Sequence, residues 1–177
     1  MTQKLPFVLG FAAYSGTGKT RLLTQLIPLL KQQGLKVAVI KHSHHDVEMD
    51  QPGKDSYRLR MAGATPVILA SAYRQIMIAE RDSEQPVSLA EQLAALQHYP
   101  LDLVLVEGFR HEAFAKIELH RPSLGKPLLY PHDPHIIAIA SDDTSLPIPA
   151  DLPILDLNNI DAIQNFILHY CRGWSHD

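Results

Sequence analysis

A glycine-bearing segment near the N-terminus carries the residues best suited to bind phosphate. An apolar stretch over residues 6–12 leads into Ala13-Tyr14-Ser15-Gly16-Thr17-Gly18-Lys19-Thr20, and the residues that follow have the apolar periodicity of a helix. This is the pattern G-x-x-x-x-G-K-[ST] except at its first position, where Ala13 replaces glycine. Glycines allow main-chain N–H groups to surround phosphate oxygens, and a helix N-terminus adds positive potential. The segment therefore predicts a nucleoside triphosphate site.

Two side chains of this segment have distinct predicted roles. Lys19 is placed to reach the outer phosphates, and the Thr20 hydroxyl is placed to ligate Mg²⁺. Ala13 is a tolerated departure, because its small methyl group costs little where φ is negative. The predicted nucleotide contacts run along the loop and into the first helical turn: Ser15, Gly16, Thr17, Gly18, Lys19, Thr20 and Arg21.

Carboxylates for a metal site come from later segments. Residues 102–107 are predicted to form a buried strand that ends in Glu107, and the carboxyl end of a central strand lies beside a phosphate loop. Asp102 is the less suitable acid, because it lies roughly 16 Å away at the far end of that strand. Asp55 opens a short predicted helix, where it is either a metal ligand or an N-cap. Asp50 is a further acid in the same segment.

Several other polar residues follow predicted strands and leave two interpretations open. Lys41 and Arg110 are phosphate contacts or surface cations. The histidines at 42, 44 and 45 contact anionic groups or are solvated, and their spacing does not favour a zinc site. Asp142 follows a predicted strand over residues 136–140. It could accept hydrogen bonds from N1–H and the 2-amino group of guanine, or it could be a turn acid.

The elements that must position these residues alternate between strands and helices. Helices are predicted at 20–33, 55–62, 88–99 and from 158 onward. Strands are predicted at 6–12, 35–40, 65–71, 74–80, 101–106, 115–120, 136–140 and 154–157. Pro28 is expected to kink or break the first helix. The two strands between 65 and 80 predict a hairpin at a sheet edge, where a second subunit could pair with it. The fold class is a three-layer α/β/α P-loop NTPase with a mostly parallel sheet.

Composition sets the broad class. The 177 residues carry a net charge of −3 and a single cysteine, Cys171. The net charge gives no electrostatic reason to expect binding to nucleic acid or to an anionic membrane surface. The single cysteine is typical of a protein of the reducing cytoplasm. We expect one domain over residues 1–177.

Four blocks of residues resemble the molybdopterin-guanine dinucleotide biosynthesis protein B (MobB) family. They are residues 13–20, residues 40–46, residues 50–56 with 62–64, and residues 105–110. The resemblance implies a dimeric GTP-binding protein with weak GTPase activity, an adapter for the guanylyltransferase that attaches GMP to molybdopterin. The wider fold is similar to that of dethiobiotin synthetase, and matching its motifs implies that Thr20, Asp55 and Glu107 hold Mg²⁺. Lys19, Thr20 and Glu107 are then the residues expected to act in hydrolysis.

Two other functions fit the same residues. A small-molecule kinase or ATP-dependent ligase would use Lys41 and the histidine-rich loop to hold an acceptor. Alternatively, nucleotide binding orders the hairpin and loops so that a partner protein docks, and hydrolysis plays no part. The sequence alone does not identify the base of the nucleotide, the geometry of the dimer or the surface on which a partner protein docks.

Overall fold

The computed structural model describes residues 5–43 and 47–173, so His44 and His45 lie outside the described residues. The chain divides into two compact units. The first is formed by the segments up to His42 and from Leu89 onward, and the second by Ser43–Ser88. No helix within the described ranges is long and apolar enough to cross a membrane.

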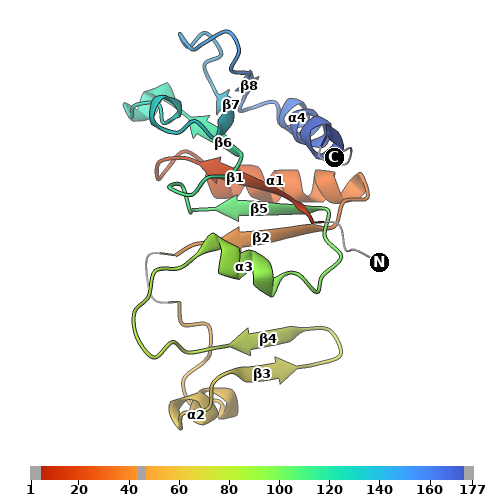
Figure 1. The fold of residues 1–177 in the computed structure, drawn as a ribbon, viewed down its shortest axis with the longest axis vertical. Helices are drawn as coiled ribbons and strands as arrows, with labels where there is room; N and C mark the ends of the chain where they lie inside the picture. The colour runs from red at the N-terminus through yellow and green to blue at the C-terminus, as the bar shows by residue number, and fades with distance from the viewer. Residues whose placement is uncertain (1–4, 44–46, 174–177) are drawn as a thin grey trace. The chain divides into compact units, whose positions relative to one another are not determined.

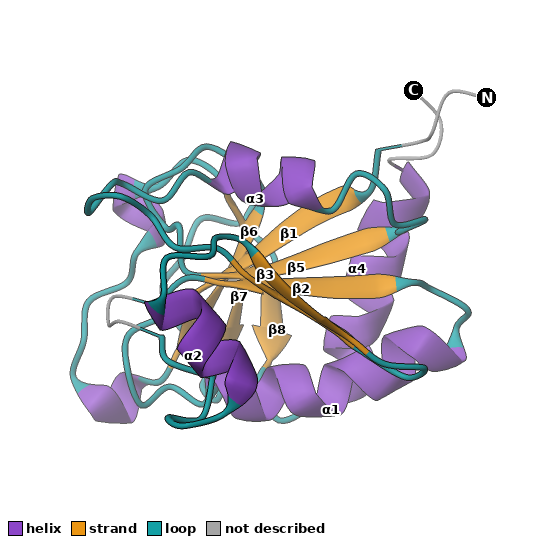
Figure 2. Cartoon of the chain, turned by 90° about the horizontal axis from the view of Figure 1, so that it is seen from below, coloured by secondary structure: helices purple, strands orange, loops and turns teal. Residues whose placement is uncertain are grey.

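The first unit is built on a six-stranded sheet with the order β2-β5-β1-β6-β7-β8 (Figure 1). Every pairing in this sheet is parallel. Helices lie on both faces, with α1 and α4 on one and α3 on the other (Figure 2). The predicted three-layer fold is confirmed. Its elements are β1 (Phe7–Ala12), α1 (Lys19–Gln32), β2 (Val37–Lys41), α3 (Leu89–Ala95), β5 (Leu103–Glu107), β6 (Lys116–His120), β7 (Ile136–Ser141), β8 (Ile154–Asp156) and α4 (Ile160–Gly173), with short 3₁₀ turns at Pro122–Leu124 and Tyr130–His132.

The main core lies between the sheet and helices α1 and α4. Alternate residues of β1, β5 and β6 point into it, as the period of a strand requires, and the buried leucines of α1 meet them. Leu26 and Leu30 of α1 and Ile163 and Ile167 of α4 are fully buried. Gln164 Nε2 also donates a hydrogen bond of 3.0 Å to the Leu29 carbonyl, which ties α4 to α1.

Helix α1 ends as its sequence predicts. Gly34 has φ +83°, and its N–H donates to Lys31 O while Leu35 N–H donates to Leu30 O, which closes the helix in a Schellman motif. Of the two effects predicted for Pro28, the break is wrong, because α1 continues through it to Gln32, and the kink stays a prediction. Helix α3 is shorter than predicted, since it ends at Ala95 and residues 96–99 continue as hydrogen-bonded turns.

The opposite face of β6 is polar and buried. Lys116, Glu118 and His120 alternate along the strand and are 1%, 1% and 6% exposed. Lys116 Nζ pairs with Asp133 at 2.9 Å, and Glu118 accepts hydrogen bonds from two backbone N–H groups of the proline-rich loop, at 129 and 130. Burial raises the pKa of Glu118, and these two hydrogen bonds act in the opposite direction. Buried charges therefore anchor the loop over residues 122–135 to the sheet.

The second unit contains α2 (Asp55–Met61) and a hairpin of β3 (Val67–Ala70) and β4 (Gln75–Ile78). The hairpin is antiparallel, as predicted. Its predicted place at the edge of the main sheet is wrong, because the two strands form a sheet of their own. Each strand has only four residues and pairs with the other, within the second compact unit.

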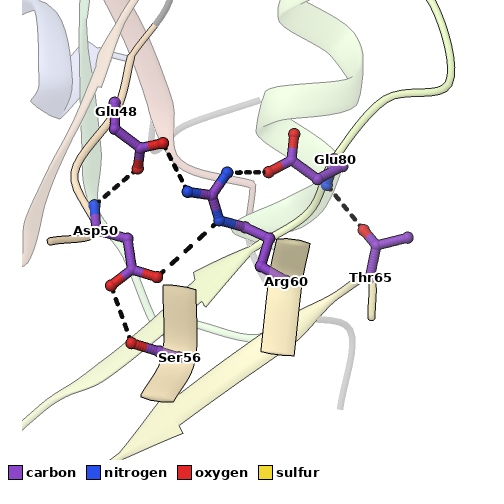
Figure 3. A network of polar contacts seen from close by, with 6 residues as sticks. All are labelled: Glu48, Asp50, Ser56, Arg60, Thr65 and Glu80. Atoms are coloured by element: carbon purple, nitrogen blue, oxygen red, sulfur yellow. Dashed lines mark hydrogen bonds and ion pairs between the residues drawn. The ribbon is translucent and has the colours of Figure 1, made fainter. Parts of the chain in front are cut away.

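Arg60 holds the second unit together (Figure 3). Its guanidinium donates to Glu80 Oε1 at 2.5 Å and to Glu48 Oε2 at 2.6 Å, and its Nε lies 4.0 Å from Asp50 Oδ2. Asp50 Oδ1 in turn accepts a hydrogen bond from Ser56 in the first turn of α2. These contacts join the segment before α2, the helix itself and the segment after β4.

Adding a methyl group at position 10 should destabilise the first unit. A Cβ at Gly10 would lie 2.6 Å from Phe114 Cε2 and 2.9 Å from Lys116 Cγ, so Gly10→Ala overpacks this face. We expect a loss of about 1–3 kcal/mol in the free energy of unfolding, measured by denaturant titration. Gly173→Ala is the control, since a Cβ there meets nothing within 4 Å. Equal stability of the two variants would contradict this packing.

Removing the Arg60 guanidinium should loosen the second unit alone. Arg60→Met leaves Glu48, Asp50 and Glu80 close together without their cation, so amide hydrogen exchange over residues 47–80 should accelerate. Exchange in the six-stranded sheet should stay unchanged. Arg58→Met is the control, because Arg58 lies exposed on the same helix. If both variants exchange alike, the network is not what stabilises the unit.

Candidate functional site

The parallel sheet brings the segments that follow its six strands to one edge, because the carboxyl ends of parallel strands lie together. The loop after β1 emerges between the ends of β5 and β6. Glu107 ends β5 opposite Lys41 of β2, and Asp142 follows the last residue of β7. The predicted nucleotide residues of the first unit therefore gather at this edge.

The loop after β1 leaves backbone amides available to an anion. Gly16 and Gly18 have φ +83° and +96°, a left-handed conformation that favours glycine. Thr17 is buried and its hydroxyl donates to the Tyr14 carbonyl, which closes the turn. Gly18 is the N-cap of α1 and provides no side-chain cap. The first turn of the helix contains no acidic residue. The helix N-terminus therefore keeps its positive potential for a ligand.

Lys19 lies in a cluster of positive charge. Its Nζ donates to Ala13 O at 3.4 Å, and Lys41 Nζ lies 3.5 Å from Glu107 Oε1. Burial is the main cause that lowers the pKa of Lys19. The Glu107 carboxylate opposes it, and the charges of Lys41 and Arg110 lower it further. The charges of two further cations and one carboxylate thus act on Lys19, and a polyphosphate would neutralise the excess positive charge.

The turn after β5 fixes Glu107. Gly108 has φ +100°, and a Cβ there would lie 2.6 Å from His42 Cβ, so only glycine fits. Phe109 also adopts a positive φ, 52°, and its buried ring stacks on His42 with the ring centroids 4.8 Å apart. His42 N–H donates to Glu107 O at 2.8 Å. His42 therefore packs against the turn, and its contact with an anionic group stays a prediction.

Asp102 lies at the other end of β5 and has a structural contact. Its Oδ2 accepts a hydrogen bond of 2.8 Å from Lys36 N–H, just before β2. This contact supports the choice of Glu107 over Asp102 as the acid beside the loop.

Sequence reasoning missed Arg121. Its Nε donates to Thr17 O at 2.9 Å, and its Nη1 donates to Asp142 Oδ2 at 2.5 Å. Asp142 is thus paired with a residue that also holds the phosphate loop. Asp143 instead accepts hydrogen bonds from the backbone N–H and the hydroxyl of Ser145. The signal that could have identified Arg121 is its position, because it is a cation directly after a strand predicted to end beside the nucleotide site.

The predicted metal set draws on both units. Thr20 lies in the first turn of α1 and Glu107 at the end of β5, whereas Asp55 is in the first turn of α2 in the second unit. Lys54 is the N-cap of α2, so the N-cap alternative for Asp55 is wrong. Among the described residues, no group of three His, Cys, Asp or Glu side chains forms a metal site. The joint ligation of Mg²⁺ by these three residues stays a prediction.

Comparisons with known proteins give a consistent result. The sequence model of the family "Molybdopterin guanine dinucleotide synthesis protein B" (MobB) matches residues 8–142. The chain is 44% identical over 166 residues to the molybdopterin-guanine dinucleotide biosynthesis adapter protein of Escherichia coli, which covers 93% of each chain. It is 43% identical over 177 residues to the protein of that name from Haemophilus influenzae, covering 98% of this chain and 95% of the relative.

A solved structure extends the similarity to the fold. The crystal structure of a molybdopterin-guanine biosynthesis protein B (mobB) superposes with a TM-score of 0.67 at 26% identity, and the match covers 94% of this chain and 99% of that one. The family model covers the phosphate loop, Lys41, Glu107 and the Arg121–Asp142 pair. On this sequence and structural evidence, the chain belongs to the MobB family.

Proposed function

We propose that this protein binds GTP with Mg²⁺, hydrolyses it slowly and acts as an adapter in molybdopterin guanine dinucleotide synthesis. The observation that carries the proposal is the excess positive charge around the open helix N-terminus. The charges of Lys41 and Arg110 act on Lys19 there, and Glu107 is the carboxylate that pairs with Lys41.

The phosphate part of the proposal rests on the loop. The amides at the start of α1 and the Lys19 ammonium would hold the phosphate chain, and Lys41 would move from Glu107 toward the added negative charge. Thr20, Asp55 and Glu107 supply the hydroxyl and carboxylate oxygens that Mg²⁺ prefers. The ion would offset charge between the outer phosphates when it is bound. Glu107 is only partly exposed, and its carboxylate would be free to bind the ion once Lys41 had moved away.

Slow hydrolysis follows from what these residues can do. The predicted site residues bind phosphate and metal, and none of them is a water-orienting glutamine. Arg121 is engaged with Thr17 O and Asp142, so its guanidinium is already hydrogen-bonded on two sides. Such a site holds nucleotide longer than it turns it over, which suits an adapter.

The biological role is carried over from the relatives. Two similar proteins are named adapter proteins of molybdopterin-guanine dinucleotide biosynthesis, and nearly the whole chain matches them. We propose a molybdopterin guanylyltransferase as partner, a homodimer as the assembly and the cytoplasm as the location. GTP-dependent capture of the guanylyltransferase on the immobilised chain would test the partner.

Replacing Lys19 by alanine should weaken nucleotide binding. A charge-assisted hydrogen bond contributes about 1.5–3 kcal/mol, so GTP and GDP should bind roughly 10- to 100-fold less tightly by calorimetry with Mg²⁺. Lys31→Ala, at the other end of α1, is the control and should bind as the unchanged chain does. Unchanged affinity in Lys19→Ala would exclude the loop as the site.

The same titration decides between the candidate functions. The adapter proposal expects GTP and GDP to bind more tightly than ATP. Preference for ATP, with turnover stimulated by a pterin acceptor, would support a kinase or ligase instead.

Replacing Glu107 by glutamine should weaken Mg²⁺-dependent hydrolysis. The amide keeps the size of the side chain but loses the charge that attracts the cation, so the Mg²⁺ concentration for half-maximal turnover should rise at least about tenfold. Asp102→Asn is the control at the other end of β5, and its metal dependence should stay unchanged. An unchanged Mg²⁺ requirement of Glu107→Gln would remove Glu107 from the metal site.

A further inference from the structure

We propose that Arg121 is a positioning residue that links selection of guanine to the phosphate loop. One guanidinium holds the carbonyl of Thr17 and the carboxylate of Asp142, so the preference for guanine over adenine nucleotides depends on it. The inference rests on the proposed function, because it requires a guanine nucleotide in this site.

Arg121 is the first residue after β6, which lies between β1 and β7 in the sheet. The phosphate loop follows β1 and Asp142 follows β7, so the side chain spans the ends of three adjacent strands. Its Nη2 lies 3.9 Å from the position a Cβ would take on Gly18. The side chains of Arg121 and Asp142 are each 28% exposed, which leaves both partly accessible to a ligand.

On the loop side, Arg121 fixes a peptide plane. The carbonyl of Thr17 and the N–H of Gly18 belong to one trans peptide and point in opposite directions. A hydrogen bond of 2.9 Å from Arg121 Nε therefore also sets the direction of the Gly18 amide donor. That donor lies in the loop predicted to surround phosphate.

On the side predicted to face the base, Arg121 orients the Asp142 carboxylate and leaves part of its hydrogen-bond capacity unused. A carboxylate can accept about four hydrogen bonds, and the structure gives one of them, on Oδ2, to Arg121. Two donors on one edge of guanine, N1–H and the 2-amino group, match the remaining capacity, whereas adenine has an acceptor at N1. Asp143 is less suitable, because its Oδ1 already accepts both hydrogen bonds from Ser145.

The residue type matters to this argument. Arginine presents five donors in a rigid plane and can serve two partners in fixed directions, while lysine is a point charge on a flexible chain. A partly exposed ion pair adds little to stability. The pair is therefore better explained by positioning than by folding energy.

The test is calorimetry of GDP, ADP and pyrophosphate with Mg²⁺ on the full chain and its variants. Arg121→Gln should weaken pyrophosphate binding and lower the ratio of GDP to ADP affinity about tenfold, the discrimination that a well-placed pair of hydrogen bonds provides. Asp142→Asn should lower the ratio and leave pyrophosphate unchanged. In the double variant Arg121→Gln with Asp142→Asn, the ratio of GDP to ADP affinity should fall no further than in Asp142→Asn alone. Arg172→Gln and Asp143→Asn are the matched controls and should keep the ratio.

Each outcome decides the inference. If Arg121→Gln weakens GDP and ADP equally, Arg121 only supports the loop and the link is overturned. If losses in the double variant add, Arg121 and Asp142 act separately and the inference also fails. Arg121→Lys covers a failure of the glutamine variant to fold, since it keeps the charge and should still lose part of the ratio. An unchanged chain without any preference for GDP would instead overturn the proposed guanine specificity, and the inference with it.

Discussion

The N-terminus of α1, which has no side-chain cap, is the constraint on which the surrounding site depends. A helix that starts on Gly18 without a side-chain cap needs an acceptor for its first amides, and water or an anion must supply it. Lys41 ends β2, and Arg110 and Arg121 follow β5 and β6. These cations concentrate positive potential around the start of α1. Glu107 is the carboxylate placed among Lys19 and Lys41, and it keeps this cluster from being purely repulsive.

Much of this arrangement is predictable from sequence because parallel topology is so restrictive. Once residues 6–12, 35–40 and 101–106 are recognised as parallel strands, the residues that follow them must meet at one edge. Lys41 and Glu107 therefore come together with the loop as expected. Arg121 escapes such reasoning, because its bond to Thr17 joins positions 104 residues apart and depends on side-chain direction.

Two other features show where sequence patterns mislead. Residues 116–120 alternate polar and apolar, which is typical of a strand with one wet face, yet Lys116 and Glu118 are buried. Partners from the loop over 122–135 cover them, and no local pattern reveals those partners. The residues of the hairpin predict the hairpin itself, but a hairpin pattern does not reveal which sheet it joins. Within the described residues, β3 and β4 form a two-stranded sheet of their own.

The Gly108 turn has a consequence for the end of β2. The chain enters the second unit at Ser43, directly after a histidine whose ring and backbone are both held by the residues following β5. Any shift of the Glu-Gly-Phe turn would have to move His42, because the space between Gly108 and His42 Cβ does not admit even a methyl group. A rearrangement of Glu107 would therefore also displace the end of β2, through steric contact alone.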